Sequence, residues 1–181
     1  MLKSSALPAW LVPTTVAVGI VLRFLPHPWN LTPVGAMFLF CGFASRRAAD
    51  IMLPLGAYAL SDVIFNLIVY RSPLDISNVF VWTAFALVWL IGITLKRAPS
   101  PLWIYPVGAV GAIFFFAISN FGVWVSSSMQ PHTIAGLAAT YVAGLPFFQP
   151  TLIGDLAYAT IFFGAALALS VASARRSAAS T

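Results

Sequence analysis

The positions of the few charged residues limit most strongly what this chain can fold into. Only 7% of the 181 residues are charged, and 61% are hydrophobic. Most of the nine Lys and Arg residues fall in short polar breaks between long apolar runs. The apolar core of a bilayer takes about 20 helical residues per crossing, so these runs are long enough to span it. The sequence therefore predicts an all-α, multi-pass membrane protein with a single integral membrane domain over residues 1–181.

Six apolar segments are expected to cross the membrane as transmembrane helices. They cover residues 7–24, 33–44, 51–70, 79–95, 102–125 and 152–174. The second segment is short, and a short span is tolerated where neighbouring helices shield its backbone. Residues 126–151 carry no charge and are punctuated by Pro and Gly. We expect an outer loop there with a short helix from Thr133 to about Tyr141, serving as a lid or as an interfacial helix.

The basic residues predict how this bundle is oriented. If the N-terminus is cytoplasmic, seven of the nine Lys and Arg residues fall in cytoplasmic segments, and only Arg23 and Arg71 fall outside. Such an excess is typical of the cytoplasmic side, so both termini are predicted to be cytoplasmic. The net charge of +5 does not indicate nucleic-acid binding, because the basic residues lie at span ends and not on one face.

Polar residues inside the third span are the first candidates for a functional site. Tyr58, Asp62 and Asn66 are spaced four apart and therefore share one face of a helix. An acidic residue at mid-membrane costs about 2.5–3.5 kcal/mol on insertion scales. Asp62 is thus expected to meet a polar partner on another span, or water. The pattern is consistent with interhelical hydrogen bonding and with a substrate or proton site.

The connection between the first two spans is the second candidate. Residues 23–33 contain three prolines, which prevent a continuous helix. The segment brings together a cation, an imidazole, an indole and an amide from Arg23, His27, Trp29 and Asn30. This composition suits a binding loop, and it also suits an interfacial turn in which the indole and the guanidinium reach the headgroups.

The fifth and sixth spans supply further polar and aromatic side chains at the same outer depth. Asp155 is expected near the outer start of its span, where a carboxylate also stabilises the N-terminus of its own helix. Because separate segments converge on one membrane depth, we predict an outward-facing pocket for a small-molecule ligand. Its predicted residues are Arg23, His27, Trp29, Asn30, Asp62, Asn66, Asn120, Trp124, Tyr141, Asp155 and Tyr158.

Sequence motifs for catalysis or cofactor binding are absent. The chain has no glycine-rich phosphate loop, no HExxH and no nucleophile elbow. A single cysteine, Cys41, excludes an intrachain disulfide and a CxxC metal motif. We therefore expect neither an enzyme nor a bound cofactor or metal.

Four stretches carry a resemblance that covers almost the whole chain. They are residues 22–36, Leu60-Ser-Asp62, Ser119-Asn-Phe-Gly-Val-Trp124, and residues 145–158, which end in Gly154-Asp155-Leu-Ala-Tyr158. With these stretches the chain resembles a bacterial family of small uncharacterised six-helix membrane proteins (DUF6580-like). Its size, six spans and outer polar pocket are also similar to the substrate-binding S components of energy-coupling-factor vitamin transporters.

These resemblances imply a function in the bacterial inner membrane. They imply uptake of a small micronutrient, a vitamin or a cobalamin-like cofactor, with an ATP-driven energising module as a further partner. The first helix lacks the Ala-x-x-x-Ala patch of S components that dock on a shared module, which favours a solitary transporter or a different partner. The alternatives are a proton- or ion-coupled carrier using Asp62, a membrane enzyme with His27 and Asp155 as acid and base, and a scaffold without ligand.

Overall fold

All regular secondary structure in the described part of the chain is helical. The computed structural model describes residues 4, 7–26, 30–98 and 100–179, and the side chains of these residues except 70 and 177–179. Six α-helices form the bundle: α1 (Leu11–Phe24), α2 (Val34–Ala44), α3 (Met52–Ile64), α4 (Ile76–Thr94), α5 (Ile104–Ser126) and α6 (Ile134–Ala179). Shorter turns are the 3₁₀-helices η2 (Ala48–Ile51), η4 (Leu95–Arg97) and η5 (Pro101–Trp103), and the π-helix η3 (Phe65–Tyr70). The predicted all-α class is confirmed.

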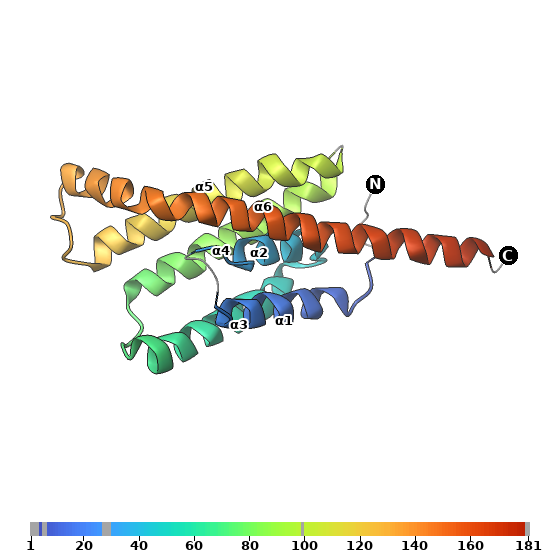
Figure 1. The fold of residues 1–181 in the computed structure, drawn as a ribbon, viewed down its shortest axis with the longest axis horizontal. Helices are drawn as coiled ribbons and strands as arrows, with labels where there is room; N and C mark the ends of the chain where they lie inside the picture. Colours follow the sequence, from blue (N-terminus) through green and yellow to red (C-terminus); the bar gives the residue numbers. More distant parts are fainter. Residues whose placement is uncertain (1–3, 5–6, 27–29, 99, 180–181) are drawn as a thin grey trace.

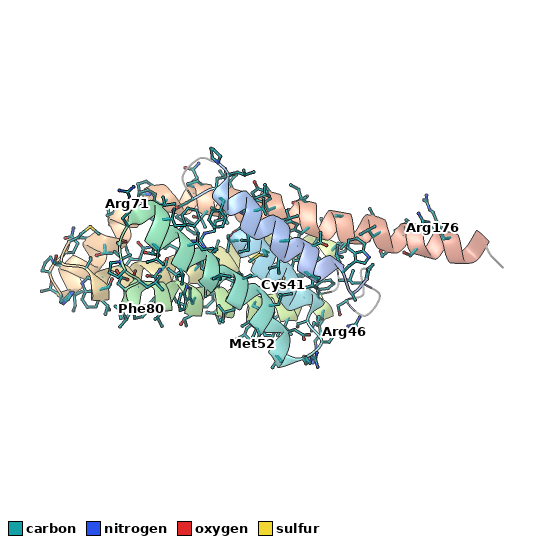
Figure 2. All side chains as sticks on the ribbon, turned by 90° about the horizontal axis from the view of Figure 1, so that it is seen from below. Cys41, Arg46, Met52, Arg71, Phe80 and Arg176 are labelled. Atoms are coloured by element: carbon teal, nitrogen blue, oxygen red, sulfur yellow. The ribbon has the colours of Figure 1, made fainter. Side chains whose placement is uncertain are left out.

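Successive helices run back and forth along the long axis of the molecule (Figure 1). The connections from α1 to α2, from α3 to α4 and from α5 to α6 lie towards one end. The other end holds the remaining connections, the start of α1 and the last turns of α6. Arg46 and Arg176 lie towards that second end, and Arg71 lies towards the opposite end (Figure 2). The bundle therefore separates its basic residues along its length, as expected for helices that alternate in direction.

Four helical stretches are long and apolar enough to cross a membrane. They are Ala48–Val69, Ile76–Arg97, Pro101–Ser126 and Ile134–Arg176. Leu11–Phe24 and Val34–Ala44 are shorter apolar helices. Large hydrophobic side chains are exposed on the outside of the bundle, Leu60 at 62% and Leu67 at 65%. Such a surface suits lipid better than water, so the architecture fits a multi-pass membrane protein.

The last helix corrects one prediction. Residues 126–151 were expected to form an outer loop with a short helix, but only residues 127–133 separate α5 from α6. The helix α6 continues for 46 residues through Pro146 and Pro150. A proline removes one backbone hydrogen bond, whereas unwinding would leave several backbone groups unpaired among apolar neighbours. At about 69 Å, α6 is more than twice the thickness of a hydrocarbon core, and it extends past the bundle at its C-terminal end (Figure 1).

The short helix α2 forms the centre of the bundle. All eleven of its residues are buried. Its length of about 16 Å is only half of a bilayer crossing. Two glycines allow it to approach α4 closely, because a Cβ at Gly42 or Gly92 would overlap the backbone of the other helix. Phe38 of α2 stacks on Phe85 of α4 with ring centroids 5.0 Å apart. The remaining helices therefore surround a buried half-helix.

Candidate functional site

A cavity of about 600 Å³ lies in the half of the bundle where α1 ends and α2 begins. Eight of the side chains that line it are aromatic: Phe24, Tyr58, Phe65, Phe85, Phe115, Phe116, Phe147 and Phe148. Its polar lining residues are Arg23, Asn30, Thr32, Ser119, Asn120, Thr151 and Asp155. All six helices contribute, so a space of this composition depends on the complete bundle. Its volume lies within the usual range of small-molecule pockets, about 300–1,000 Å³.

Arg23 and Asp62 form an ion pair beside this cavity. The guanidinium donates to the carboxylate of Asp62 and to the hydroxyl of Ser61. The side chains are 15% and 5% exposed, so the pair is largely removed from solvent. The other carboxylate oxygen of Asp62 accepts from Nε1 of Trp82 at 2.7 Å. The expectation that Asp62 meets a polar partner on another helix is confirmed, and the pair links α1, α3 and α4.

Two aromatic rings cover the guanidinium of Arg23. Its central carbon lies 4.3 Å from the ring centroid of Tyr58 and 4.8 Å from that of Phe65. Phe24 stacks on Phe65 with ring centroids 4.6 Å apart. Cation–π contacts of a desolvated guanidinium are worth about 2 kcal/mol. The charge of Arg23 is therefore both paired and shielded at the cavity wall.

Asp155 occupies the N-terminus of the half-helix α2. It lies inside α6 and is 8% exposed, and its carboxylate accepts hydrogen bonds from the backbone amides of Gly35 and Ala36. A Cβ at Gly35 would overlap this carboxylate. The first amides of any helix lack intrahelical partners, and an acid there is stabilised by the helix dipole. The prediction that Asp155 lies near the start of its own helix is wrong; it caps α2 instead.

Lys96 completes the same arrangement at the other end of α2. Its ammonium donates to the backbone carbonyl of Ser45, the residue that follows α2, and to the hydroxyl of Ser45 at 3.1 Å. A cation at a helix C-terminus is the favourable partner for the carbonyl end of the dipole. A basic and an acidic side chain from other elements thus hold the buried half-helix at both ends.

Polar groups of α5 and α6 also line the cavity. Asn120 donates from Nδ2 to the carbonyl of Phe116 at 2.8 Å, and its amide packs directly on Gly144, where a Cβ would overlap it. The Ser119 hydroxyl donates to the carbonyl of Phe115 at 2.7 Å. The Thr151 hydroxyl makes the equivalent bond within α6 at 2.8 Å. These side chains present oxygen lone pairs at the edge of an aromatic cavity.

The connection between α1 and α2 is only partly described. Asn30 lines the cavity and has a φ of 59°, a left-handed conformation that asparagine tolerates better than most residues. His27 and Trp29, which the sequence also predicts as ligand-binding residues, lie outside the described residues.

Five predicted residues are not among those that line the cavity: Asp62, Asn66, Trp124, Tyr141 and Tyr158. Trp124 donates to the carbonyl of Pro131 at 3.1 Å and so ties α5 to the connection before α6. Tyr141 donates to the carbonyl of Ala117 at 2.7 Å, between α6 and α5. These two side chains join the walls of the cavity to each other.

Asn66 and Tyr158 also make structural contacts. Asn66 donates to the backbone carbonyl of Asp62 at 2.9 Å, at the start of the π-helix η3. Tyr158 packs on Phe162 within α6 with ring centroids 6.3 Å apart.

Sequence reasoning missed most of the phenylalanine side chains that line the cavity. The adjacent pair Phe115-Phe116, one turn before Ser119-Asn120, is the signal that could have revealed them.

The described residues contain no group of three or more His, Cys, Asp or Glu side chains that could hold a metal ion. Cys41 is free and buried in α2. The described part of the chain is all-helical, its long apolar helices fit a multi-pass membrane protein, and it holds a cavity lined by aromatic side chains. The chain belongs to a family of unknown function (DUF6580), whose model matches residues 4–178, so the predicted family resemblance is confirmed. No curated protein and no solved structure matches it significantly.

Proposed function

We propose that this chain binds a small micronutrient in the aromatic cavity and takes part in its uptake across the bacterial inner membrane. The cavity itself is the observation that carries the proposal. It has the volume of a small-molecule site, an apolar wall and a few fixed polar groups, as ligand pockets usually do. A vitamin-sized ring compound suits this volume.

The position of the half-helix supports transport over a purely structural role. The N-terminus of α2 lines the cavity through Val34 and Gly35, and both of its ends are held by side chains of other elements. Transporters often form their binding sites from such interrupted helices within the membrane. The similarity to the substrate-binding S components of vitamin transporters is proposed on this architecture.

The proposed orientation has both termini in the cytoplasm and the cavity open to the outside. Three basic pairs, beginning at Arg46, Lys96 and Arg175, belong to segments at the end of the bundle where α1 begins. Cytoplasmic segments of membrane proteins carry such an excess of Lys and Arg. The cavity lies in the opposite half, which then faces the side from which a nutrient arrives. An energising module would act from the cytoplasmic end.

The ligand that copurifies with the protein provides the test. Mass spectrometry of protein extracted from native membranes should detect a small molecule in stoichiometric amount. Phe116→Ala should lower its occupancy, because Phe116 lines the cavity and packs on Phe148 with ring centroids 5.1 Å apart. Phe114→Ala is the matched control, since Phe114 is 45% exposed and is not among the lining residues. Equal occupancy in both variants, or none in the wild type, would count against the proposal.

Cysteine labelling in intact cells tests the orientation. Ser72→Cys and Ala174→Cys, each introduced with Cys41→Ser, place single thiols at exposed positions without removing a charge. A membrane-impermeant thiol reagent should label the cysteine at position 72 and spare the one at position 174. The reverse result would invert the proposed topology and turn the cavity towards the cytoplasm.

A further inference from the structure

We infer that the cavity selects an uncharged, ring-bearing ligand with N–H or O–H donors and discriminates against anionic and cationic analogues of the same shape. This inference rests on the proposed function and specifies its ligand. The observation behind it is that the two charged residues lining the cavity, Arg23 and Asp155, already have partners within the protein.

An anionic ligand would have to compete for Arg23. The guanidinium is bonded to Asp62 and Ser61, and the rings of Tyr58 and Phe65 cover it. Drawing Arg23 towards a ligand carboxylate would leave Asp62 charged at 4% exposure, without its counterion. Breaking a buried ion pair in this way is strongly unfavourable. The positive charge at the wall is therefore not available to a ligand.

A cationic ligand would face the same difficulty at Asp155. The carboxylate is 8% exposed and accepts from the amides of Gly35 and Ala36 at the N-terminus of α2. An ammonium group that drew the carboxylate away would leave these amides unpaired inside the protein. The carboxyl group of Asp155 is thus already occupied at the N-terminus of α2.

Aromatic faces and acceptor oxygens are among the groups that remain for a ligand. Phe115 packs against Phe85, with centroids 4.6 Å apart, and the wall continues through Phe116 and Phe148. Planar rings bind well between such faces. The hydroxyls of Ser119 and Thr151 donate their hydrogen bonds to backbone carbonyls of their own helices. Their oxygen atoms can therefore accept a hydrogen bond from a ligand. An uncharged ring with donors on its edge complements this lining.

Three probes of one shape separate the effects of charge. They are 2-naphthamide, 2-naphthoate and 2-naphthylmethylammonium, each added to the protein in nanodiscs of zwitterionic lipid. Binding is read from the labelling of Cys41, which is 2% exposed and reacts when the protein opens. A ligand that binds only the folded state slows this labelling about tenfold at about ten times its Kd. We expect slowing by the amide and almost none by the carboxylate or the ammonium compound at the same concentration.

Two variants make the result specific. Phe116→Ala should abolish the slowing by the amide, since it opens the aromatic wall. Asp62→Asn releases the guanidinium of Arg23 from its counterion, so 2-naphthoate should then protect more strongly than 2-naphthamide. Wild-type protection by either charged probe that equals that of the amide would overturn the charge selectivity while leaving the binding site intact. If none of the three naphthalene probes slows the labelling of Cys41, the inference is overturned. The proposed function is then still tested separately, by mass spectrometry of the copurified ligand.

Discussion

Removing one partner of the Arg23–Asp62 pair should destabilise the protein far more than removing both. Asp62→Leu leaves the guanidinium of Arg23 at 15% exposure without its counterion, and Arg23→Leu leaves the carboxylate at 5% exposure. A charged side chain at the centre of a membrane helix costs about 2.5–3.5 kcal/mol, and breaking a buried pair costs about 3–5 kcal/mol. We therefore expect each single variant to lose about 3 kcal/mol of unfolding free energy.

The double variant Arg23→Leu/Asp62→Leu carries no unpaired charge at this place. Trp82 loses its acceptor in it, and the Ser61 hydroxyl keeps only its bond to the carbonyl of Tyr58, which together costs about 1 kcal/mol. The loss in the double variant should then be smaller than in either single variant. These losses imply a coupling energy of about 5 kcal/mol for the cycle, which is larger than the roughly 0.5–3 kcal/mol usual for side chains in contact.

Labelling of Cys41 by a thiol-reactive dye in mild detergent measures these differences. Cys41 is the single cysteine of the chain and lies buried in α2, so it reports opening of the bundle without further mutation. Its labelling rate is proportional to the open population when reclosing is fast. A loss of 3 kcal/mol corresponds to a rate increase of about a hundredfold, and 1 kcal/mol to about fivefold. Single variants that change the rate less than about threefold, or effects that simply add in the double variant, would refute the reasoning.

Three further changes test the centre of the bundle. Gly42→Val should prevent close packing of α2 on α4, and the yield of monodisperse protein in size-exclusion chromatography should fall sharply. Gly56→Val is the control and should elute normally, because nothing lies within 4 Å of a new Cβ there. Lys96→Ala should speed the labelling of Cys41 about tenfold, because a hydrogen bond to a charged group contributes about 1.5 kcal/mol or more. Arg97→Ala, at an exposed neighbouring position, should leave the labelling rate unchanged. Asp155→Leu should cost about 1–2 kcal/mol in the same assay by uncapping α2, whereas Asp155→Asn, which keeps an acceptor oxygen, should retain most of the stability; equal losses in both would contradict the capping role.

Local pattern in the sequence determined the class of the fold and the need for particular partners. Apolar runs between sparse charges required helices, because a backbone in lipid must satisfy its own hydrogen bonds. Asp62 inside such a run required a polar partner, and it has one in Arg23. The prolines of residues 126–151 misled the same reasoning, because the cost of a missing amide is small beside that of unwinding α6 among apolar neighbours.

Only the tertiary structure decided which side chains meet. The sequence contains no sign that Asp155 caps another helix, since this depends on how far α6 extends and on where α2 begins. The phenylalanine wall is likewise a product of helix rotation, which brings rings from five helices onto one space. Hydropathy is a local property of each segment. Contacts between segments depend instead on the relative depth and rotation of the packed helices. Close packing, such as that of Gly42 against α4, sets this depth and rotation.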